Sequence, residues 1–143
     1  MIRRHLLLAA PLLLCAAPAL AATTTPNINI RLDDGSVWRT TVKQTSSEGF
    51  LRIHNDGLTD DVLTSWSCPN AGQTILMGKD GKALTQLVIP AKTTIALAPG
   101  GIYLELKDMQ YPVERGSVLP CAFTFQQAGQ LGGFLNASKR PKG

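Results

Sequence analysis

Along most of the chain, apolar and polar residues alternate in short runs and do not recur every three or four positions. Alternation with a period of two is typical of β-strands with one buried face, whereas a period of 3.6 marks amphipathic helices. The runs that predict strands are 27–32, 50–54, 62–66, 73–77, 84–89, 93–97, 101–106, 118–125 and 130–136. No long segment has helical periodicity, so the pattern predicts an all-β protein.

Turn-forming residues separate these runs at intervals of about eight to twelve residues, the spacing of sandwiches and barrels. They are Asp33-Asp34-Gly35, Asn55-Asp56-Gly57, Pro69-Asn70-Ala71-Gly72, Lys79-Asp80-Gly81, Pro99-Gly100-Gly101 and Gly132-Gly133. The segment 79–82 is expected to form a hairpin turn in which Gly81 takes a positive φ. Pro120 cannot donate to a sheet ladder, which predicts an edge position or a bulge there.

The N-terminus has the three parts of a secretory signal peptide. Arg3 and Arg4 supply positive charge, Leu6–Leu14 is an apolar run too short to span a bilayer, and small residues precede a predicted cleavage after Ala21. Cleavage after Ala22 is the alternative. The sequence therefore predicts an exported, periplasmic protein with no transmembrane segment once the signal is removed.

The expected organisation is a signal peptide at 1–21, one β-sandwich domain at 22–138 and a basic tail at 139–143. About 120 residues suffice for a single core but not for two. A lipoprotein anchored at Cys15 is a competing interpretation, which the large Leu14 before that cysteine disfavours.

Charge adds little to this picture once the signal is removed. The chain has 14 Lys and Arg against 10 Asp and Glu, and the signal removes two arginines, which leaves 12 against 10. Lys139, Arg140 and Lys142 belong to the tail, and no basic stripe alternates with aromatic residues, so nucleic-acid binding is not expected. The tail is interpreted as a solvated end, with a weak contact to an anionic membrane surface as the alternative.

After processing, two cysteines remain, Cys68 and Cys121. An even pair in an oxidising compartment predicts a disulfide. Two separate cysteines, or a pair active in redox or metal chemistry, remain as alternatives.

The residues offer little support for an enzyme. His54 is the only histidine after the signal, and no Gly-x-Ser-x-Gly motif is present, so nucleophilic catalysis would depend on a residue interpreted as a polar strand position. Asp60 and Asp61 are adjacent and are expected to flank a turn rather than to act as a carboxylate pair. Zinc spacings such as Cys-x-x-Cys are also missing.

Several motifs, in order along the chain, resemble the PCu(A)C family of periplasmic copper chaperones. The motifs are Trp38-Arg39, the segment 49–57, Asp61-Val62-Leu63, Ile89-Pro90-Ala91 followed by the segment 97–101, and the segment 123–129. The resemblance implies a cupredoxin-like antiparallel β-sandwich.

The departure from the family pattern falls on its copper site, which consists of two histidines and two methionines. After Pro-Gly-Gly the family has x-His-x-Met, and here these two places hold Tyr103 and Glu105. The family's first histidine corresponds to Met77 or Gly78, and the methionine-rich stretch is reduced to the segment 83–86. The resemblance therefore marks Met77, Tyr103 and Glu105 as site positions with poor ligands for copper(I).

The function expected from these observations is non-enzymatic. It is that of a PCu(A)C-like accessory protein without the standard copper site, which binds a partner in copper or oxidase assembly and needs no cofactor. One alternative is a true copper chaperone with an altered ligand set that includes Met77, Glu105 or the cysteines. A second alternative is a thiol-disulfide protein that uses Cys68 and Cys121.

Overall fold

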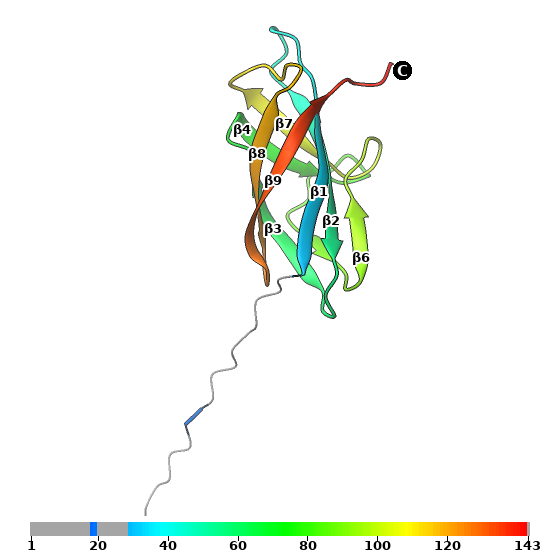
Figure 1. Ribbon diagram of the computed structural model, residues 1–143, viewed down its shortest axis with the longest axis vertical. Coiled ribbons are helices and arrows are strands. Elements are labelled where there is room, and N and C mark those ends of the chain that lie inside the picture. Colours follow the sequence, from blue (N-terminus) through cyan, green and yellow to red (C-terminus); the bar gives the residue numbers. More distant parts are fainter. Residues whose placement is uncertain (1–17, 20–28, 143) are drawn as a thin grey trace, which may run out of the picture.

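The protein is described here by a computed structural model that covers residues 18–19 and 29–142 (Figure 1). The predicted signal peptide and its cleavage site lie almost wholly outside the described residues. Within them the chain forms strands only, with no helix that could cross a membrane. The strands are β1 (Ile30–Trp38), β2 (Ser47–Asn55), β3 (Asp61–Ser67), β4 (Ala71–Met77), β5 (Leu87–Ile89), β6 (Thr93–Ala96), β7 (Tyr103–Met109), β8 (Val118–Phe125) and β9 (Gly129–Ser138).

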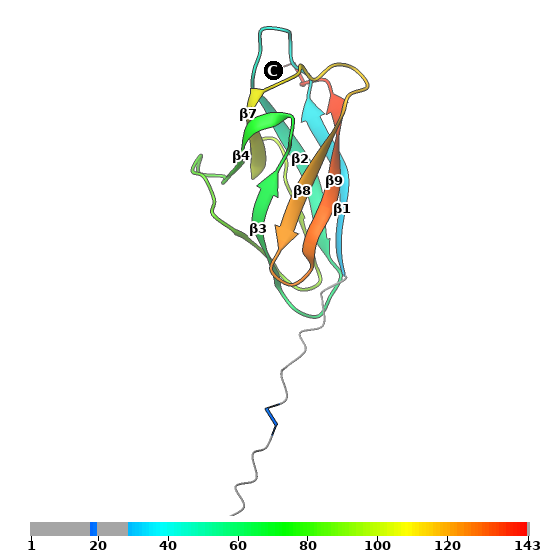
Figure 2. The ribbon, with the colours of Figure 1, turned by 90° about the vertical axis from the view of Figure 1, so that its left-hand side faces the viewer.

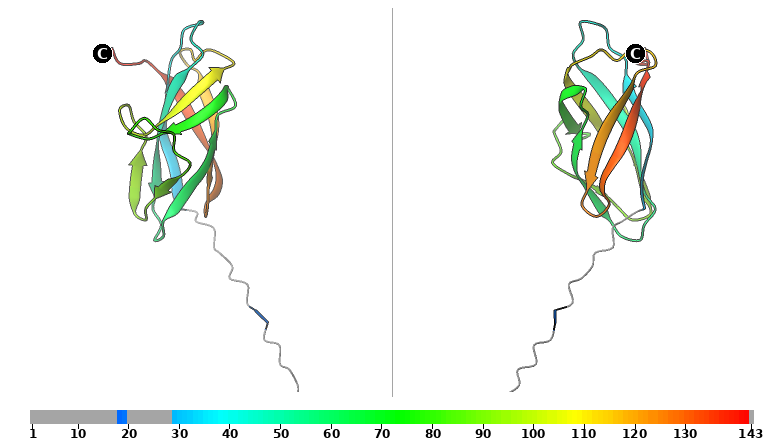
Figure 3. Two further views of the ribbon diagram at one scale, coloured as in Figure 1. Left: turned by 180° about the vertical axis from the view of Figure 1, so that it is seen from behind. Right: turned by 60° about the vertical axis from the view of Figure 1, so that its left-hand side comes forward.

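The strands join into one curled nine-stranded sheet with the order β4-β7-β2-β1-β9-β8-β3-β5, to which β6 is added beside β2. Curling brings the two ends of this order together, so that β4 and β7 cross the β1–β2–β9 layer (Figures 2 and 3). All pairs are antiparallel except β1 and β9, which run parallel from Ser36 to Trp38. The predicted all-β sandwich is confirmed, with this one parallel pair in addition.

The core lies between the layers and consists of the inward-facing residues of the alternating strands. Its largest fully buried apolar residues are Phe123, Phe125, Ile53, Leu63, Leu76, Ile89, Leu104, Leu106, Leu135, Val37 and Val113. They come from eight strands and the loop that contains Val113, so the burial of apolar area, the main driving force for folding, requires the whole sheet to close.

The first strand differs from its prediction, because Asp33-Asp34-Gly35 does not form a turn. Instead β1 continues through it with a β-bulge, visible as a register shift against β2 between Asp33 and Ser36. Asp34 has a φ of 51°, which a short polar side chain tolerates better than most. Residues that favour turns also favour bulges, and the sequence alone does not distinguish the two.

The turn predicted at Gly132-Gly133 is also wrong, because both residues lie within β9 and pair with Ala122 and Cys121 of β8. The turn predicted at 79–82 agrees with the structure. Gly78 and Lys82 close the predicted hairpin turn by an N–H···O=C bond of 2.8 Å, and Gly81 has a φ of +76°.

The strand predicted at 84–89 is shorter, because only Leu87–Ile89 pairs with β3. Pro120 lies opposite Phe134 of β9, whereas β3 pairs with β8 only from residue 122 onward, so the proline occupies a locally free edge.

Two features tie the β3 region to the hairpin of β8 and β9. Cys68 and Cys121 form the predicted disulfide, with Cα atoms 4.2 Å apart. The buried Asp61 carboxylate accepts hydrogen bonds from the backbone N–H groups of Val62, Gln127 and Ala128 at 2.8–2.9 Å. Asp61 is therefore a structural residue at a turn, as expected, and its charge is satisfied by the backbone.

Candidate functional site

The candidate site lies on the outer face of β7 and its neighbours β4 and β2. On β7, Leu104 and Leu106 are fully buried, so the alternate residues Tyr103 and Glu105 face outward. On β4, Leu76 is fully buried, so Met77 faces the same way as Tyr103. Strand alternation thus puts the three predicted site positions on one surface of the sheet.

The sheet register then brings the three side chains together. Met77 is the direct partner of Tyr103 across the β4–β7 pair, and Glu105 follows two residues along β7. On the other side, Glu48 of β2 is the direct partner of Glu105. Side chains of directly opposed residues lie within roughly 5.5 Å at their Cβ atoms. Glu48 is an additional member of the site that the motif comparison did not identify.

The cluster contains two carboxylates, Glu48 and Glu105. Lys107 Nζ lies 3.7 Å from Glu105 Oε1, and both side chains are partly exposed, so this ion pair is solvent-screened. Partial burial raises the pKa of the Tyr103 phenol above its ordinary value of 10.0, and the negative charges of Glu48 and Glu105 raise it further. At neutral pH Tyr103 is therefore a protonated phenol, which is a hydrogen-bond donor and not a metal ligand.

The donor set of the cluster is one thioether, two carboxylates and a phenol. Copper(I) prefers thioether, thiolate and imidazole ligands, whereas carboxylates suit harder ions. The only histidine of the described residues, His54, is six residues along β2 from Glu48, which corresponds to roughly 20 Å of extended strand. No group of three or more His, Cys, Asp and Glu side chains in the described ranges is arranged to hold a metal ion.

His54 instead belongs to a hydrogen-bonded group on β1, β2 and β6. Its Nε2 lies 2.8 Å from Asp33 Oδ1, and its Nδ1 lies 2.8 Å from Thr94 Oγ1. The carboxylate can only accept, so Nε2 carries the proton, and in the neutral ring Nδ1 accepts from the Thr94 hydroxyl. The hydrogen bond from His54 lowers the pKa of Asp33 from 3.8, and the positive charge of Arg31 contributes to this shift.

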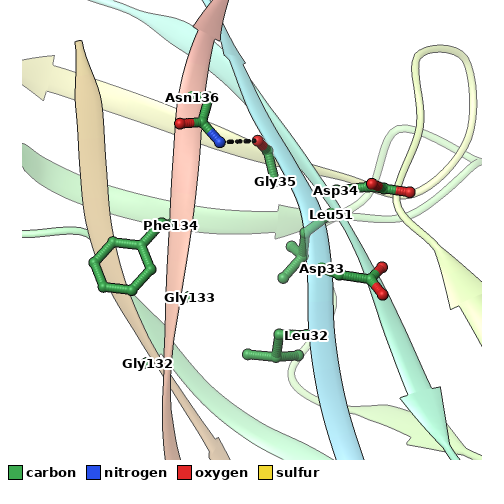
Figure 4. Close-up of a pocket in the computed structure, with 9 residues that line it drawn as sticks. All are labelled: Leu32, Asp33, Asp34, Gly35, Leu51, Gly132, Gly133, Phe134 and Asn136. Atoms are coloured by element: carbon green, nitrogen blue, oxygen red, sulfur yellow. Dashed lines mark hydrogen bonds between the residues drawn. The ribbon is translucent and has the colours of Figure 1, made fainter.

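A cavity of about 330 Å³ opens between β1 and β9, where the two strands diverge below their short parallel pairing (Figure 4). It is lined by Leu32, Asp33, Asp34, Gly35, Leu51, Gly132, Gly133, Phe134 and Asn136. Its two carboxylates already have partners, because Asp33 contacts His54 and Arg31, and Asp34 pairs with Arg52 at 3.2 Å. The cavity therefore presents no free anionic group to a cation.

The disulfide was the third predicted element of the site. Cys68 and Cys121 are 2% and 5% exposed, and Cys121 lies within β8. A thiolate partner needs access to a sulfur atom for exchange, and neither of these sulfurs offers it. The structure therefore supports the structural interpretation of this cysteine pair.

Solved structures with the same fold include PCuAC domains. The apo PCuAC domain from PmoF1 superposes with a TM-score of 0.72 at 23% identity, over 78% of this chain and 95% of that chain. The copper-bound PCuAC domain from PmoF2 superposes with a TM-score of 0.71 at 15% identity, over 78% of this chain and 94% of that chain. The copper(I) form of DR1885 from Deinococcus radiodurans superposes with a TM-score of 0.67 at 17% identity, over 83% of this chain and 84% of that chain. At these identities the likeness defines the fold class, a cupredoxin-like β-domain of the PCuAC type.

The sequence itself matches one protein family, described as putative lipoprotein LpqE-like, over residues 30–132. This match covers well over half of the chain, and the chain belongs to that family. A search among curated proteins gives no match.

Proposed function

We propose that this protein is an exported accessory protein of the PCuAC type whose standard copper site is replaced, and that it works in the periplasm by binding a partner in copper or oxidase assembly. The class of its relatives supports a role connected with copper, and the lipoprotein description of its family supports export. We further propose that it is not an enzyme and needs no resident cofactor.

The observation that carries this proposal is the composition of the outer face of β4, β7 and β2. The positions that the resemblance assigns to copper hold Met77, Tyr103 and Glu105, and the register adds Glu48 beside them. One soft ligand among hard oxygen donors gives a weak site for copper(I), because affinity depends on several soft groups that converge on one point. The cluster suits hydrogen bonding and ion pairing with a protein surface better.

The test is a competition assay between the purified protein and a calibrated copper(I) chelator. We expect the oxidised protein to lose copper(I) to a chelator that copper-binding PCuAC domains resist. The double substitution Tyr103→His and Glu105→Met puts imidazole and thioether beside Met77, and it should raise copper(I) affinity at least tenfold. The matched control is Ser65→His with Ser67→Met, two exposed positions of β3 that have the same i, i+2 spacing but lie outside the cluster.

The outcomes separate the alternatives. Tight one-to-one binding by the oxidised wild-type protein would contradict the replaced-site proposal and favour a copper chaperone with an altered ligand set. Tight binding only after reduction would assign copper(I) to Cys68 and Cys121. If the double substitution does not change the affinity, Tyr103 and Glu105 are not the positions that correspond to the family's ligands.

The thiol-disulfide alternative receives no support from the geometry. Both cysteines are buried and are already bonded to each other, between the turn after β3 and the middle of β8. Reactive cysteines lie in accessible, electropositive surroundings, and these two do not.

A further inference from the structure

Three chain segments meet at the end of the molecule where the C-terminus lies, opposite the end at which β1 begins (Figure 1). They surround an open basin of about 470 Å³ lined by Arg39, Thr40, Thr41, Val113, Glu114, Arg115, Lys139 and Arg140. We call this region the basic end, because four of the eight lining residues are cationic and one is acidic.

The cations of the basic end differ from the other arginines of the domain. Arg31 and Arg52 each pair with an aspartate at 3.1–3.3 Å. In contrast, Arg39, Arg115 and Lys139 have no ion pair with any described residue, and their charge is therefore available to an outside partner. The domain body is close to neutral overall, so these unpaired charges give the molecule a positive end.

The basic end is held in place by the fold. Thr40 and Val113 exchange two hydrogen bonds, from Thr40 N–H to Val113 O at 2.9 Å and from Val113 N–H to Thr40 Oγ1 at 2.8 Å. Arg39 N–H bonds to Ser138 O at 2.9 Å, and the Arg140 guanidinium lies 4.2 Å from the centre of the Trp38 ring. The cations from three segments are thus presented together.

Exposed apolar and aromatic side chains adjoin these cations. Val42 is 88% exposed in the loop next to Thr41 and is followed by Lys43, and Tyr111 is 69% exposed two residues before Val113. Loop tips that combine basic residues with an exposed aliphatic and a tyrosine are typical of surfaces that contact the membrane interface. A discrete anion site would instead enclose its ligand, and this basin is open.

We propose that the basic end docks on an anionic membrane surface, where its cations meet lipid phosphates and Val42 and Tyr111 enter the headgroup layer. This surface is separate from the cluster around Tyr103. Each cation near an anionic bilayer contributes about fivefold to the binding constant, so the four cations of the basin raise it by several hundredfold at low salt. Salt screens the attraction over about 10 Å at 0.1 M, so the binding must weaken as salt rises.

The experiment is co-sedimentation of the purified exported protein with vesicles of phosphatidylcholine containing phosphatidylglycerol, compared with phosphatidylcholine alone. We expect binding to the anionic vesicles only, with loss in 0.5 M salt. The double substitution Arg115→Gln and Lys139→Gln should weaken binding about 25-fold. Both side chains lack an ion pair within residues 29–142, so the fold does not depend on them. Adding Val42→Ser should weaken vesicle binding further, because it removes the apolar side chain that enters the headgroup layer. This side chain is exposed, so its loss should not disturb the fold.

The matched control is Lys79→Gln with Lys82→Gln, which changes the net charge equally in the exposed turn after β4. Equal weakening by both double substitutions would overturn the proposal, because it would show an effect of net charge alone. Absence of vesicle binding at low salt would also overturn it, and would leave an acidic protein as the partner of these charges. Release by a few millimolar inorganic phosphate at constant ionic strength would overturn it in favour of a discrete anion site.

Discussion

Gly35 is a position at which the fold leaves no room for a side chain. A Cβ atom built there would overlap the carbonyl oxygen of Phe134 on β9, a backbone atom that cannot move aside without shifting the strand. The close approach belongs to the bulge of β1, where Asn136 Nδ2 also donates to Gly35 O at 3.3 Å (Figure 4). Gly35 therefore permits β1 and β9 to come together above the cavity.

We predict that Gly35→Ala lowers the free energy of unfolding by about 3 kcal/mol, because β1 and β9 must separate to admit the methyl group. Gly132→Ala is the matched control, since a Cβ atom at Gly132 meets nothing within 4 Å. It should change stability by less than about 0.5 kcal/mol. Urea unfolding of both variants measures the difference, and equal stabilities would contradict the close approach of the two strands.

Acid sensitivity at the residue scale centres on Asp33 and its hydrogen bond from His54. Because its pKa is lowered in the folded state, the ionised carboxylate stabilises the fold above the ordinary pKa of 3.8, and this contribution is lost as the pH falls through the lowered pKa. We predict that carbon-13 NMR finds the Asp33 carboxyl titrating below 3.8. The substitution His54→Gln should move the midpoint of this carboxyl titration to a higher pH. An unchanged midpoint in that variant would assign the shift to Arg31 instead.

At the scale of the strands, the sequence predicts the fold well where alternation is local. The strand expected at 118–125 is observed with the same bounds, and β3 and β4 extend the runs at 62–66 and 73–77 by one or two residues. In β8 the buried face has a period of two that is visible in the sequence, whereas β3 and β4 bury fewer residues. Local pattern is sufficient here because the same residues pack in the core.

The predictions fail where a contact distant in sequence decides the local conformation. Asp33-Asp34-Gly35 has the composition of a turn. The strand β1 nevertheless continues through it as a bulge, because it pairs with β2 on both sides of the bulge and with β9, a hundred residues away in the sequence, directly after it. The stretch at 84–86 has enough apolar character for a strand, but β3 pairs only with residues 87–89. Neither partner can be identified from the local residues.

The candidate site shows the same division. Strand alternation predicts that Tyr103 and Glu105 share a face, and the structure agrees. The position of Met77 opposite Tyr103, and of Glu48 opposite Glu105, depends on the register of β7 against two strands from other parts of the chain. The sequence carries no clear signal for Glu48, because its neighbours Ser47 and Gly49 are buried in the structure but are not large apolar residues, and the predicted strand begins at residue 50.

At the scale of the whole molecule, the disulfide ties together two distant parts of the sheet. It joins residues 53 positions apart and fixes the turn between β3 and β4 against β8. A closed loop of that length stabilises a protein by about 4 kcal/mol in the chain-entropy model. Since small domains are stable by only about 5–15 kcal/mol, this bond supplies a large share of the total.

We predict that Cys68→Ser with Cys121→Ser lowers the free energy of unfolding by about 4 kcal/mol, measured by denaturant unfolding of the exported protein. A reducing agent should destabilise the wild-type protein by a similar amount, because a reduced chain loses the same constraint on its unfolded state. The double variant serves as the control, since a reducing agent should leave its free energy of unfolding unchanged. Mass spectrometry of unreduced peptides must show the cross-link in the wild-type protein. A wild-type protein that is fully cross-linked, yet equally stable before and after reduction, would show that the curled sheet closes without help from this bond.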